Sequence, residues 1–209
     1  MSILFDMTDE TANTRTAHSA RQEAFLNAAI QVFARYGYRK ASLDQVAQVA
    51  GASRQGLYLH FASKEELFRA TVEHALAQHL SAVTTALSQD RPLVERLVAA
   101  CDEWAGRYVG TGTQDAQDLA AASTLMTSDT LAAYGARFEE ALALAVADSK
   151  LMRAYIGAGL TAQDVARTLH MVTQGIKQGS SNRQEFLNEM NTSVAVLIAP
   201  MLHLTKGSS

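Results

Sequence analysis

Four side chains between residues 54 and 60 carry the hydrogen-bonding groups that proteins use to contact double-stranded DNA. Arg54 and Gln55 are adjacent, and their side chains suit paired hydrogen bonds with guanine and adenine, respectively. Tyr58 and His60 follow, and each can donate a hydrogen bond to a phosphate oxygen, a contact that orients a protein on DNA. The alternative for Arg54 and Gln55 is simple solvation at exposed positions. Together, the four residue types predict a DNA-contacting segment.

Basic and small residues flank this segment on both sides. Lys64 lies just inside the start of the next predicted helix, where its ammonium and the positive end of the helix dipole favour the same phosphate group. Arg39, Lys40 and Ser42 surround the start of an earlier helix, and we expect them to contact the DNA backbone. Gly56 adds no side chain to its helix and would therefore allow a close approach to DNA.

Capping signals divide the first third of the chain into short helices. The first predicted helix begins at Ser19, with Gln22 as its capping-box partner, and ends at Gly37. Ser42 and Gln45 form the same pair of signals at the start of a second helix. Within the first helix, apolar residues recur at spacings of three and four: Phe25, Ala29, Val32, Phe33 and Tyr36. This periodicity predicts one buried face.

A tight turn separates the second predicted helix from a third. Gly51, Ala52 and Ser53 form this turn, and the Ser53 hydroxyl can cap the helix that follows. We also expect Ser53 to lie at the DNA interface. Two short helices joined by so short a turn predict a helix-turn-helix, whose second helix enters the major groove of DNA. Ser63 then begins a long fourth helix, with Glu66 as its capping-box partner.

Charge is unevenly distributed along the 209 residues. Residues 15–64 hold seven basic and two acidic side chains, a net charge of +5, whereas residues 65–209 carry a net charge of −5. A basic segment followed by an acidic one is typical of a protein that meets a polyanion at one end only. Chance clustering on a solvated face is the alternative explanation of this asymmetry.

The segment from Ala41 to Phe68 closely resembles the DNA-binding domain of the TetR family of regulators. The matching residues lie around the turn, after the third helix and in the first helix: Val46, Ala47, Ala50, Gly51, Ser53, Tyr58, His60, Phe61, Lys64, Glu65 and Leu67, with Ala28, Ala29, Phe33, Gly37 and Tyr38 upstream. Gly56 departs from the family pattern, because the usual glycine lies one position earlier, where this chain has Gln55.

The resemblance implies an all-α protein with an N-terminal three-helix helix-turn-helix domain and a C-terminal helical domain for ligand binding and dimerisation. We therefore divide the chain into a flexible arm at 1–18, a DNA-binding domain at 19–66 and a helical domain at 67–209. The implied function is that of a homodimeric transcriptional regulator, a repressor that a small-molecule ligand releases from double-stranded operator DNA. The alternative is a regulator controlled by a protein partner, or one that needs no small-molecule signal.

The last two predicted helices, at 161–178 and 183–202, carry a pattern typical of helix pairing. In the final helix, apolar residues repeat at alternating spacings of three and four, and no charged residue occurs between Glu189 and Lys206. The helix before it contains two glycines one turn apart, which would permit close approach of another helix. The predicted dimer interface is Val172, Gly175, Gly179, Leu187, Met190, Val194, Leu197 and Met201. Burial within the monomer is the alternative.

Aromatic and other polarisable side chains on the middle helices are candidates for a ligand pocket. They are Trp104, Tyr108, Met126, Tyr134, Phe138 and His170. A pocket lined in this way would suit a small apolar or aromatic ligand with one or two polar anchors. The alternative is that these residues belong to an ordinary helical core.

Other classes of function lack their sequence signals. The chain contains no nucleophile elbow, P-loop or helical His-Glu-x-x-His motif, and His74 and His79 are five residues apart, off a common helix face. The single cysteine, Cys101, excludes an internal disulfide and suits a reducing compartment. The longest uncharged stretch is too short to span a membrane. We therefore expect a cytoplasmic protein that is not an enzyme and uses no cofactor or metal.

Overall fold

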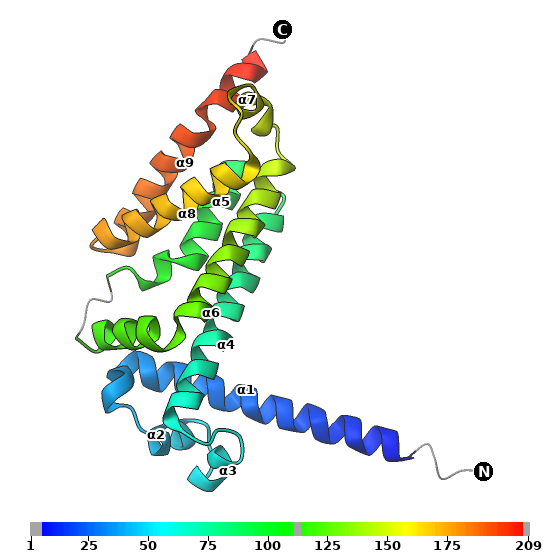
Figure 1. Ribbon diagram of the computed structural model, residues 1–209, viewed down its shortest axis with the longest axis vertical. Helices are drawn as coiled ribbons and strands as arrows, with labels where there is room; N and C mark the ends of the chain where they lie inside the picture. The colour runs from blue at the N-terminus through cyan, green and yellow to red at the C-terminus, as the bar shows by residue number, and fades with distance from the viewer. Residues whose placement is uncertain (1–5, 111–113, 207–209) are drawn as a thin grey trace. The chain divides into compact units, whose positions relative to one another are not determined.

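The computed structural model describes the backbone of residues 6–110 and 114–206, and the side chains of residues 18–110 and 116–199. Every regular element within these ranges is a helix, so the all-α prediction is confirmed. The elements are α1 Asp6–Lys40, α2 Leu43–Val49, α3 Arg54–Tyr58, α4 Lys64–Ser88, α5 Leu93–Trp104, the 3₁₀ turn η1 Gly106–Tyr108, α6 Gln114–Ala147, α7 Met152–Tyr155, the 3₁₀ turn η2 Ile156–Ala158, α8 Ala162–Gly179 and α9 Arg183–Lys206 (Figure 1).

The chain forms two compact units, and helices α4 and α6 each contribute residues to both units. Among the described residues, 6–75 and 114–128 belong to the first unit, and 76–110 and 129–206 belong to the second. Helix α6 is kinked at Thr127, whose φ of −137° and ψ of 27° are not helical. The first turns of α6, before the kink, therefore belong with the N-terminal helices rather than with the rest of α6.

Helix α1 is longer than its capping signals predicted. It begins at Asp6 rather than at Ser19, and no glycine or proline precedes Gly37 to interrupt it. Residues 6–18 of the predicted arm are therefore helical, while residues 1–5 lie outside the described ranges. Gly37 has the predicted positive φ, 70°, with a ψ of 176°, and helical geometry resumes after it up to Lys40.

Aromatic residues from three segments form the core of the first unit. Phe25, Phe33, Phe61 and Phe68 are buried, and the rings of Phe33 and Phe68 meet edge to face with their centroids 5.0 Å apart. Residues on the first turns of α6 pack against the same core: Leu119, Ala122 and Met126. This core fixes α2, α3 and the start of α4 against α1.

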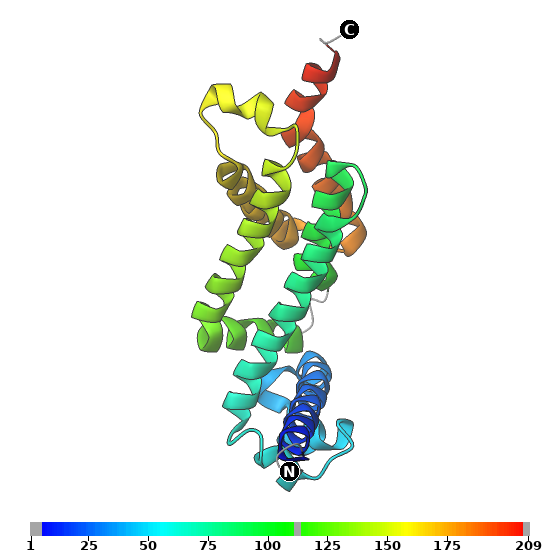
Figure 2. The same ribbon diagram turned by 90° about the vertical axis from the view of Figure 1, so that its right-hand side faces the viewer.

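The core of the second unit lies between the second part of α4, α5, the second part of α6, α8 and α9. Helices α8 and α9 run side by side in both views (Figures 1 and 2), and α9 also packs against α5. An ion pair joins α9 to α5, because Arg183 Nε donates to Asp102 Oδ1 at 2.9 Å. Burial raises the pKa of the Cys101 thiol to about 12, which makes this cysteine a packing residue rather than a reactive one.

The last two helices lie close to their predicted ranges, since α8 spans Ala162–Gly179 and α9 spans Arg183–Lys206. Helix α5 ends at Trp104, and the 3₁₀ turn η1 continues the chain to Tyr108. None of the helices in the described ranges combines the length and the apolar character that a membrane span requires.

Candidate DNA-binding interface

Side-chain caps fix both helices of the predicted helix-turn-helix. The Gln45 backbone N–H donates to Ser42 Oγ at 3.2 Å, and the Ser42 N–H donates to Gln45 Oε1 at 2.8 Å, which completes the predicted capping box. At the start of α3, the Gly56 N–H donates to Ser53 Oγ at 3.1 Å. Ser42 and Ser53, which we predicted to lie at the DNA interface, therefore also hold the two helices in place.

Two glycines are required by this local geometry. Gly51 has a φ of 62° in the turn between α2 and α3, a conformation that other residues rarely adopt. Gly56 lies on α3, where an added Cβ would come within 3.3 Å of Ser53 Oγ. The absence of a side chain at Gly56 thus leaves room for the Ser53 cap, besides the close approach to DNA that the sequence suggested.

The first turn of α3 presents Arg54 and Gln55 to solvent, as the prediction of base contacts requires. Arg54 already has partners on the same unit, because its Nη1 donates to Asp44 Oδ2 and its Nη2 donates to the Tyr58 hydroxyl, both at 3.2 Å. The Tyr58 hydrogen bond and then the Asp44 charge raise the pKa of Arg54. Sequence reasoning did not find Asp44 as a partner of Arg54, because a separation of ten residues is not a spacing that indicates an ion pair.

Tyr58 and His60 lie at the other end of α3 in different environments. Tyr58 is 42% exposed, so its hydroxyl can reach a phosphate. His60 is half-buried, and its ring stacks on that of His18 with the centroids 4.3 Å apart. Burial, followed by the charges of His18 and Arg21, lowers the pKa of His60 and so favours the neutral imidazole in the DNA-free protein. A neutral imidazole can still donate one hydrogen bond to a phosphate. Phe61, beside it, is core.

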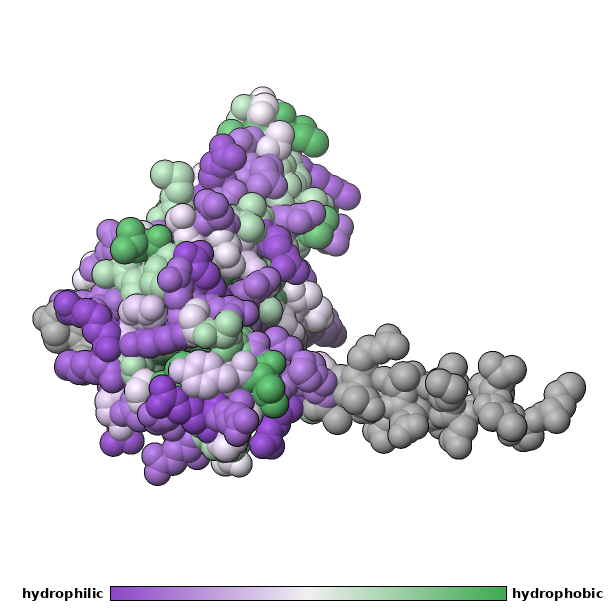
Figure 3. Space-filling model, turned by 60° about the horizontal axis from the view of Figure 1, so that its bottom comes forward, coloured by the Kyte–Doolittle hydropathy of each residue, from purple (hydrophilic) through white to green (hydrophobic). Residues whose placement is uncertain are grey.

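The remaining basic residues gather where α1 ends and α4 begins. Lys64 Nζ donates to the carbonyl oxygen of Arg39 at 3.1 Å and lies 4.7 Å from the centre of the Tyr38 ring. Burial lowers the pKa of Lys64. Arg39 and Lys40 are exposed. The part of Figure 3 at the α2–α3 end, which comes forward in that view, is mainly hydrophilic, as expected for a surface that meets DNA.

The predicted pocket residues do not form one cluster. In the second unit, Trp104 stacks on Phe138 with the ring centroids 4.6 Å apart, and His170 meets both rings edge-on. His170 Nδ1 lies 2.9 Å from Glu139 Oε1. Tyr134 packs, half-buried, against the same core.

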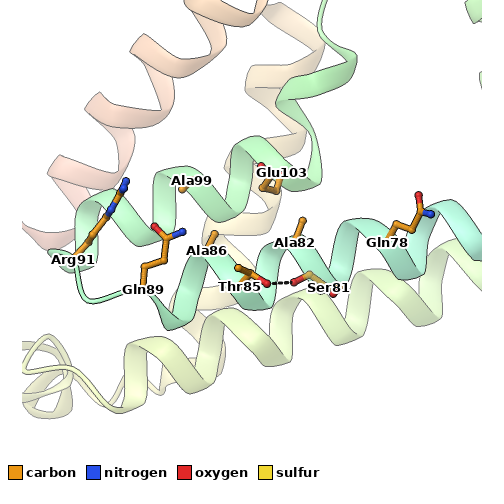
Figure 4. A pocket seen from close by; sticks show the side chains of 9 residues that line it. All are labelled: Gln78, Ser81, Ala82, Thr85, Ala86, Gln89, Arg91, Ala99 and Glu103. Carbon is orange, nitrogen blue, oxygen red and sulfur yellow. Dashed lines mark hydrogen bonds between the residues drawn. The ribbon is translucent and has the colours of Figure 1, made fainter.

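Two of the predicted pocket residues lie elsewhere. The Tyr108 hydroxyl is hydrogen-bonded to His79 Nε2, and Met126 packs against the core of the first unit. Figure 4 shows a different hollow, of about 520 Å³, between α4 and α5. It is lined by Gln78, Ser81, Ala82, Thr85, Ala86, Gln89, Arg91, Ala99 and Glu103. None of the predicted pocket residues lines this hollow.

The predicted dimer residues separate into buried and exposed sets. Met190 and Val194 are completely buried in the core of their own unit, which is the alternative that the sequence left open for them. Gly175 and Gly179 are exposed, while Val172, Leu187 and Leu197 are half-buried. The side chain of Met201 lies outside the described residues. Sequence reasoning missed two apolar side chains on the exposed faces of α8 and α9, namely Met171 at 69% and Val196 at 70% exposure.

Comparison with protein families agrees with the placement of the helix-turn-helix. The family model described as bacterial regulatory proteins, tetR family, matches residues 25–71. The matched residues cover the C-terminal part of α1 from Phe25 onward, the whole of α2 and α3, and the first turns of α4.

Curated relatives match the same part of the chain. The transcriptional activator FasR of Mycolicibacterium smegmatis is 36% identical over 88 residues, which are 42% of this chain and 40% of FasR. The regulator RutR of Escherichia coli K12 is 36% identical over 66 residues, 32% of this chain and 31% of RutR. The repressor BepR of Brucella suis is 30% identical over 97 residues, 44% of this chain and 46% of BepR. The aligned stretch thus spans less than half of each relative.

Solved structures resemble nearly the whole chain in fold. A transcriptional regulator from Rhodococcus sp. Rha1 has a TM-score of 0.61 at 17% identity, covering 85% of this chain and 96% of that one. The TetR family regulator PfmR from Thermus thermophilus has a TM-score of 0.54 at 19% identity, covering 84% of this chain and 97% of PfmR. At these identities the likeness shows the fold alone.

Proposed function

Because the chain belongs to the TetR family through its helix-turn-helix domain, we propose that it regulates transcription by binding operator DNA with α3 in the major groove. The observation that carries this proposal is the first turn of α3, where Arg54 and Gln55 are exposed on a helix capped by Ser53. Side chains at this position of a recognition helix reach base edges, and Arg and Gln make the paired hydrogen bonds that distinguish guanine and adenine.

Arg54 has to exchange its partners on binding. Its bonds to Asp44 and Tyr58 occupy two guanidinium nitrogens, and the Arg54 and Asp44 side chains are 57% and 63% exposed. An ion pair so exposed contributes little to stability, whereas a bidentate contact with guanine is among the stronger contacts in a DNA complex. The exchange of Asp44 for a guanine is therefore favourable.

The test is selection from a pool of random DNA duplexes, followed by fluorescence anisotropy with the enriched duplex. We expect enrichment of an inverted repeat with half-sites about 34–36 Å apart, one helical turn, because two copies of α3 would read it. An isolated half-site would point to a monomeric regulator. Failure to enrich any sequence above the starting pool would overturn the proposal of sequence-specific binding.

The homodimer is the second part of the proposal. The exposed faces of α8 and α9 carry two apolar side chains, Met171 and Val196, and two glycines, Gly175 and Gly179. Two copies of this pair would form a four-helix contact, and the glycines would let the backbones approach closely.

Release by a small molecule is the third part. The Trp104–Phe138 stack, with the His170–Glu139 pair beside it, brings aromatic rings and two polar groups together in the second unit. A thermal-shift screen with aromatic acids, phenols and hydrophobic amines tests this part. A ligand that stabilises the protein and lowers its anisotropy signal with DNA supports ligand control. If DNA binding is unaffected by every stabilising ligand, the regulator responds to another signal.

A further inference from the structure

A carboxylate from the first turns of α6 binds the end of α1. The Arg39 backbone N–H donates to Asp118 Oδ2 at 2.9 Å, and Arg39 Nε lies 2.6 Å from Asp118 Oδ1. These bonds join residues 79 positions apart in the sequence, within the same compact unit. The Asp118 side chain is only 12% exposed, and the backbone hydrogen bond from Arg39, together with one from Tyr38, lowers the pKa of its carboxyl group.

The kink at Gly37 explains why a carboxylate is needed here. The φ of 70° at Gly37 breaks the helical hydrogen bonding, so Tyr38 and Arg39 begin a new turn whose N–H groups have no acceptor in the preceding helix. At the start of a helix, such groups are usually bound by the side chain of the capping residue. Glycine has no side chain. Asp118 supplies the missing acceptor from another helix, and its negative charge suits the positive end of the new turn.

Lys64 binds the same residue from the other side. Its ammonium donates to the Arg39 carbonyl oxygen, so both backbone groups of Arg39 are held, one by a carboxylate and one by a cation. The neighbouring residues Leu119, Ala122 and Met126 anchor the first turns of α6 to the core of the unit. Asp118 is therefore attached to a packed element rather than to a loop.

The Arg39 guanidinium remains available for a ligand. Its side chain is 76% exposed although Nε is bound to Asp118, and guanidinium carries five N–H donors. A phosphate can bind the other donors while Nε keeps its partner. The negative charge of Asp118 opposes phosphate binding at this short range, but the carboxylate is already neutralised by its ion pair with Arg39. The inference requires that alignment of Arg39 outweighs the remaining repulsion, and the affinity of Asp118→Ala measures which of the two effects is larger.

We propose that Asp118 is a positioning residue for DNA binding, which aligns Arg39 and the turn that carries it for contact with a DNA phosphate. This inference rests on the proposed function. It assigns to α6 a role in the DNA-binding surface, and it extends the DNA-binding domain beyond residues 19–66 to include residues 114–128.

A double-mutant cycle tests the role of Asp118. The variants are Asp118→Ala, Arg39→Ala and the double variant, with anisotropy measured on the selected duplex at several salt concentrations. We expect Asp118→Ala to weaken binding about tenfold and to lower the salt dependence of binding, because Arg39 no longer holds its phosphate. In the Arg39→Ala background, removing Asp118 should change affinity by less than about twofold.

Two further variants separate positioning from folding and from overall charge. Asp118→Asn keeps an acceptor for the Arg39 N–H but loses the ion pair, so its loss of affinity should be intermediate, about threefold. Glu73→Ala removes a carboxylate from the exposed face of α4 in the same unit and should not weaken binding. Thermal unfolding followed by circular dichroism identifies any variant that has lost its fold.

Three outcomes would overturn the inference. Tighter binding by Asp118→Ala would mean that the carboxylate opposes DNA, and an equal loss in both Arg39 backgrounds would mean that it acts on folding alone. If Asp118→Ala binds the selected duplex as tightly as the wild-type protein does, Asp118 has no role in DNA binding. If the wild-type protein binds no duplex at all, the proposed function itself has failed, a result distinct from these three.

Discussion

The residues proposed to contact DNA are hydrogen-bonded to one another and to neighbouring groups in the DNA-free protein. Arg54 is bound by Asp44 and Tyr58, while Lys64 holds the backbone of Arg39. Long side chains that are already ordered lose less conformational entropy on binding than freely rotating ones. The interface is therefore partly organised in the DNA-free protein, and replacing one residue changes the geometry of its neighbours.

Replacing Arg54 should change sequence preference. Arg54→Ala removes a side chain suited to guanine, so discrimination against a mismatched base at one operator position should fall about tenfold. Tyr58→Phe removes only a hydroxyl suited to phosphate and should weaken binding to all duplexes alike. Anisotropy with the selected operator and its single-base variants measures both effects. A uniform loss for Arg54→Ala would show that this residue does not read bases.

The pH dependence of stability should reflect His79. Burial lowers the pKa of His79 and outweighs the opposing effect of its hydrogen bond to the Glu103 carbonyl oxygen, which lies 3.2 Å from Nδ1. The charges of Arg107 and Lys177 also lower this pKa, whereas that of Glu103 raises it. A histidine with a lowered pKa stays neutral in the folded state, while the unfolded chain takes up a proton near pH 6.5. The free energy of unfolding should thus fall as the pH drops from about 7 to 5.

Urea denaturation at several pH values checks this expectation. His79→Gln cannot titrate, so its stability should change less over this range than that of the wild-type protein. If the stability of His79→Gln depends on pH as strongly as that of the wild-type protein, groups other than His79 cause the pH dependence.

At the scale of the elements, features that depend on residues close together in the sequence were predictable, and features that depend on contacts between distant residues were not. The caps at Ser42 and Ser53 depend on residues three positions away, so the sequence pattern located α2 and α3 correctly. The contact between Asp118 and Arg39 depends on a partner 79 residues away, and no local signal marks it. The kink at Thr127 lies close to the boundary between the two units, and no glycine or proline beside it marks its position in the sequence.

The junction between α5 and η1 should not tolerate a side chain. A Cβ at Gly106 would come within 2.8 Å of the ring of Phe186, which is completely buried. Gly106→Ala should therefore destabilise the protein by about 1–3 kcal/mol, the usual cost of overpacking a core. Gly157→Ala is a matched control, because an added Cβ there meets nothing within 4 Å. Equal urea midpoints for the two variants would contradict the close packing at Gly106.

At the scale of the whole molecule, the apolar pattern of α9 does not by itself show whether these residues are buried in a dimer interface or in the core of the monomer. Spacings of three and four place residues on one face, but both kinds of burial require such a face. The structure assigns Met190 and Val194 to the core of the second unit, whereas Val196 is exposed. For the same reason, aromatic residues on the middle helices could be named from sequence but not grouped into one pocket.

Charge on the exposed faces of α8 and α9 should separate the proposed dimer. Met171→Glu combined with Val196→Glu places carboxylates where two copies would meet, and burying unpaired charges is strongly unfavourable. Sedimentation should show a dimer for the wild-type protein and a monomer for this variant at micromolar concentration. Leu144→Glu changes another exposed apolar residue, on α6, and should leave the dimer intact. A wild-type monomer would overturn the dimer proposal.

The division of α6 at its kink has a consequence for how the chain folds. The first unit is discontinuous, because α1 to α3 need the first turns of α6, which are made only after α5. During synthesis, the N-terminal helices therefore emerge without Asp118, Leu119 and Met126, and they wait for these partners before their packing is complete. Closing so long a loop is slow compared with local helix formation. The surface that we propose for DNA binding is thus among the last parts of its unit to complete its packing, although it lies near the beginning of the sequence.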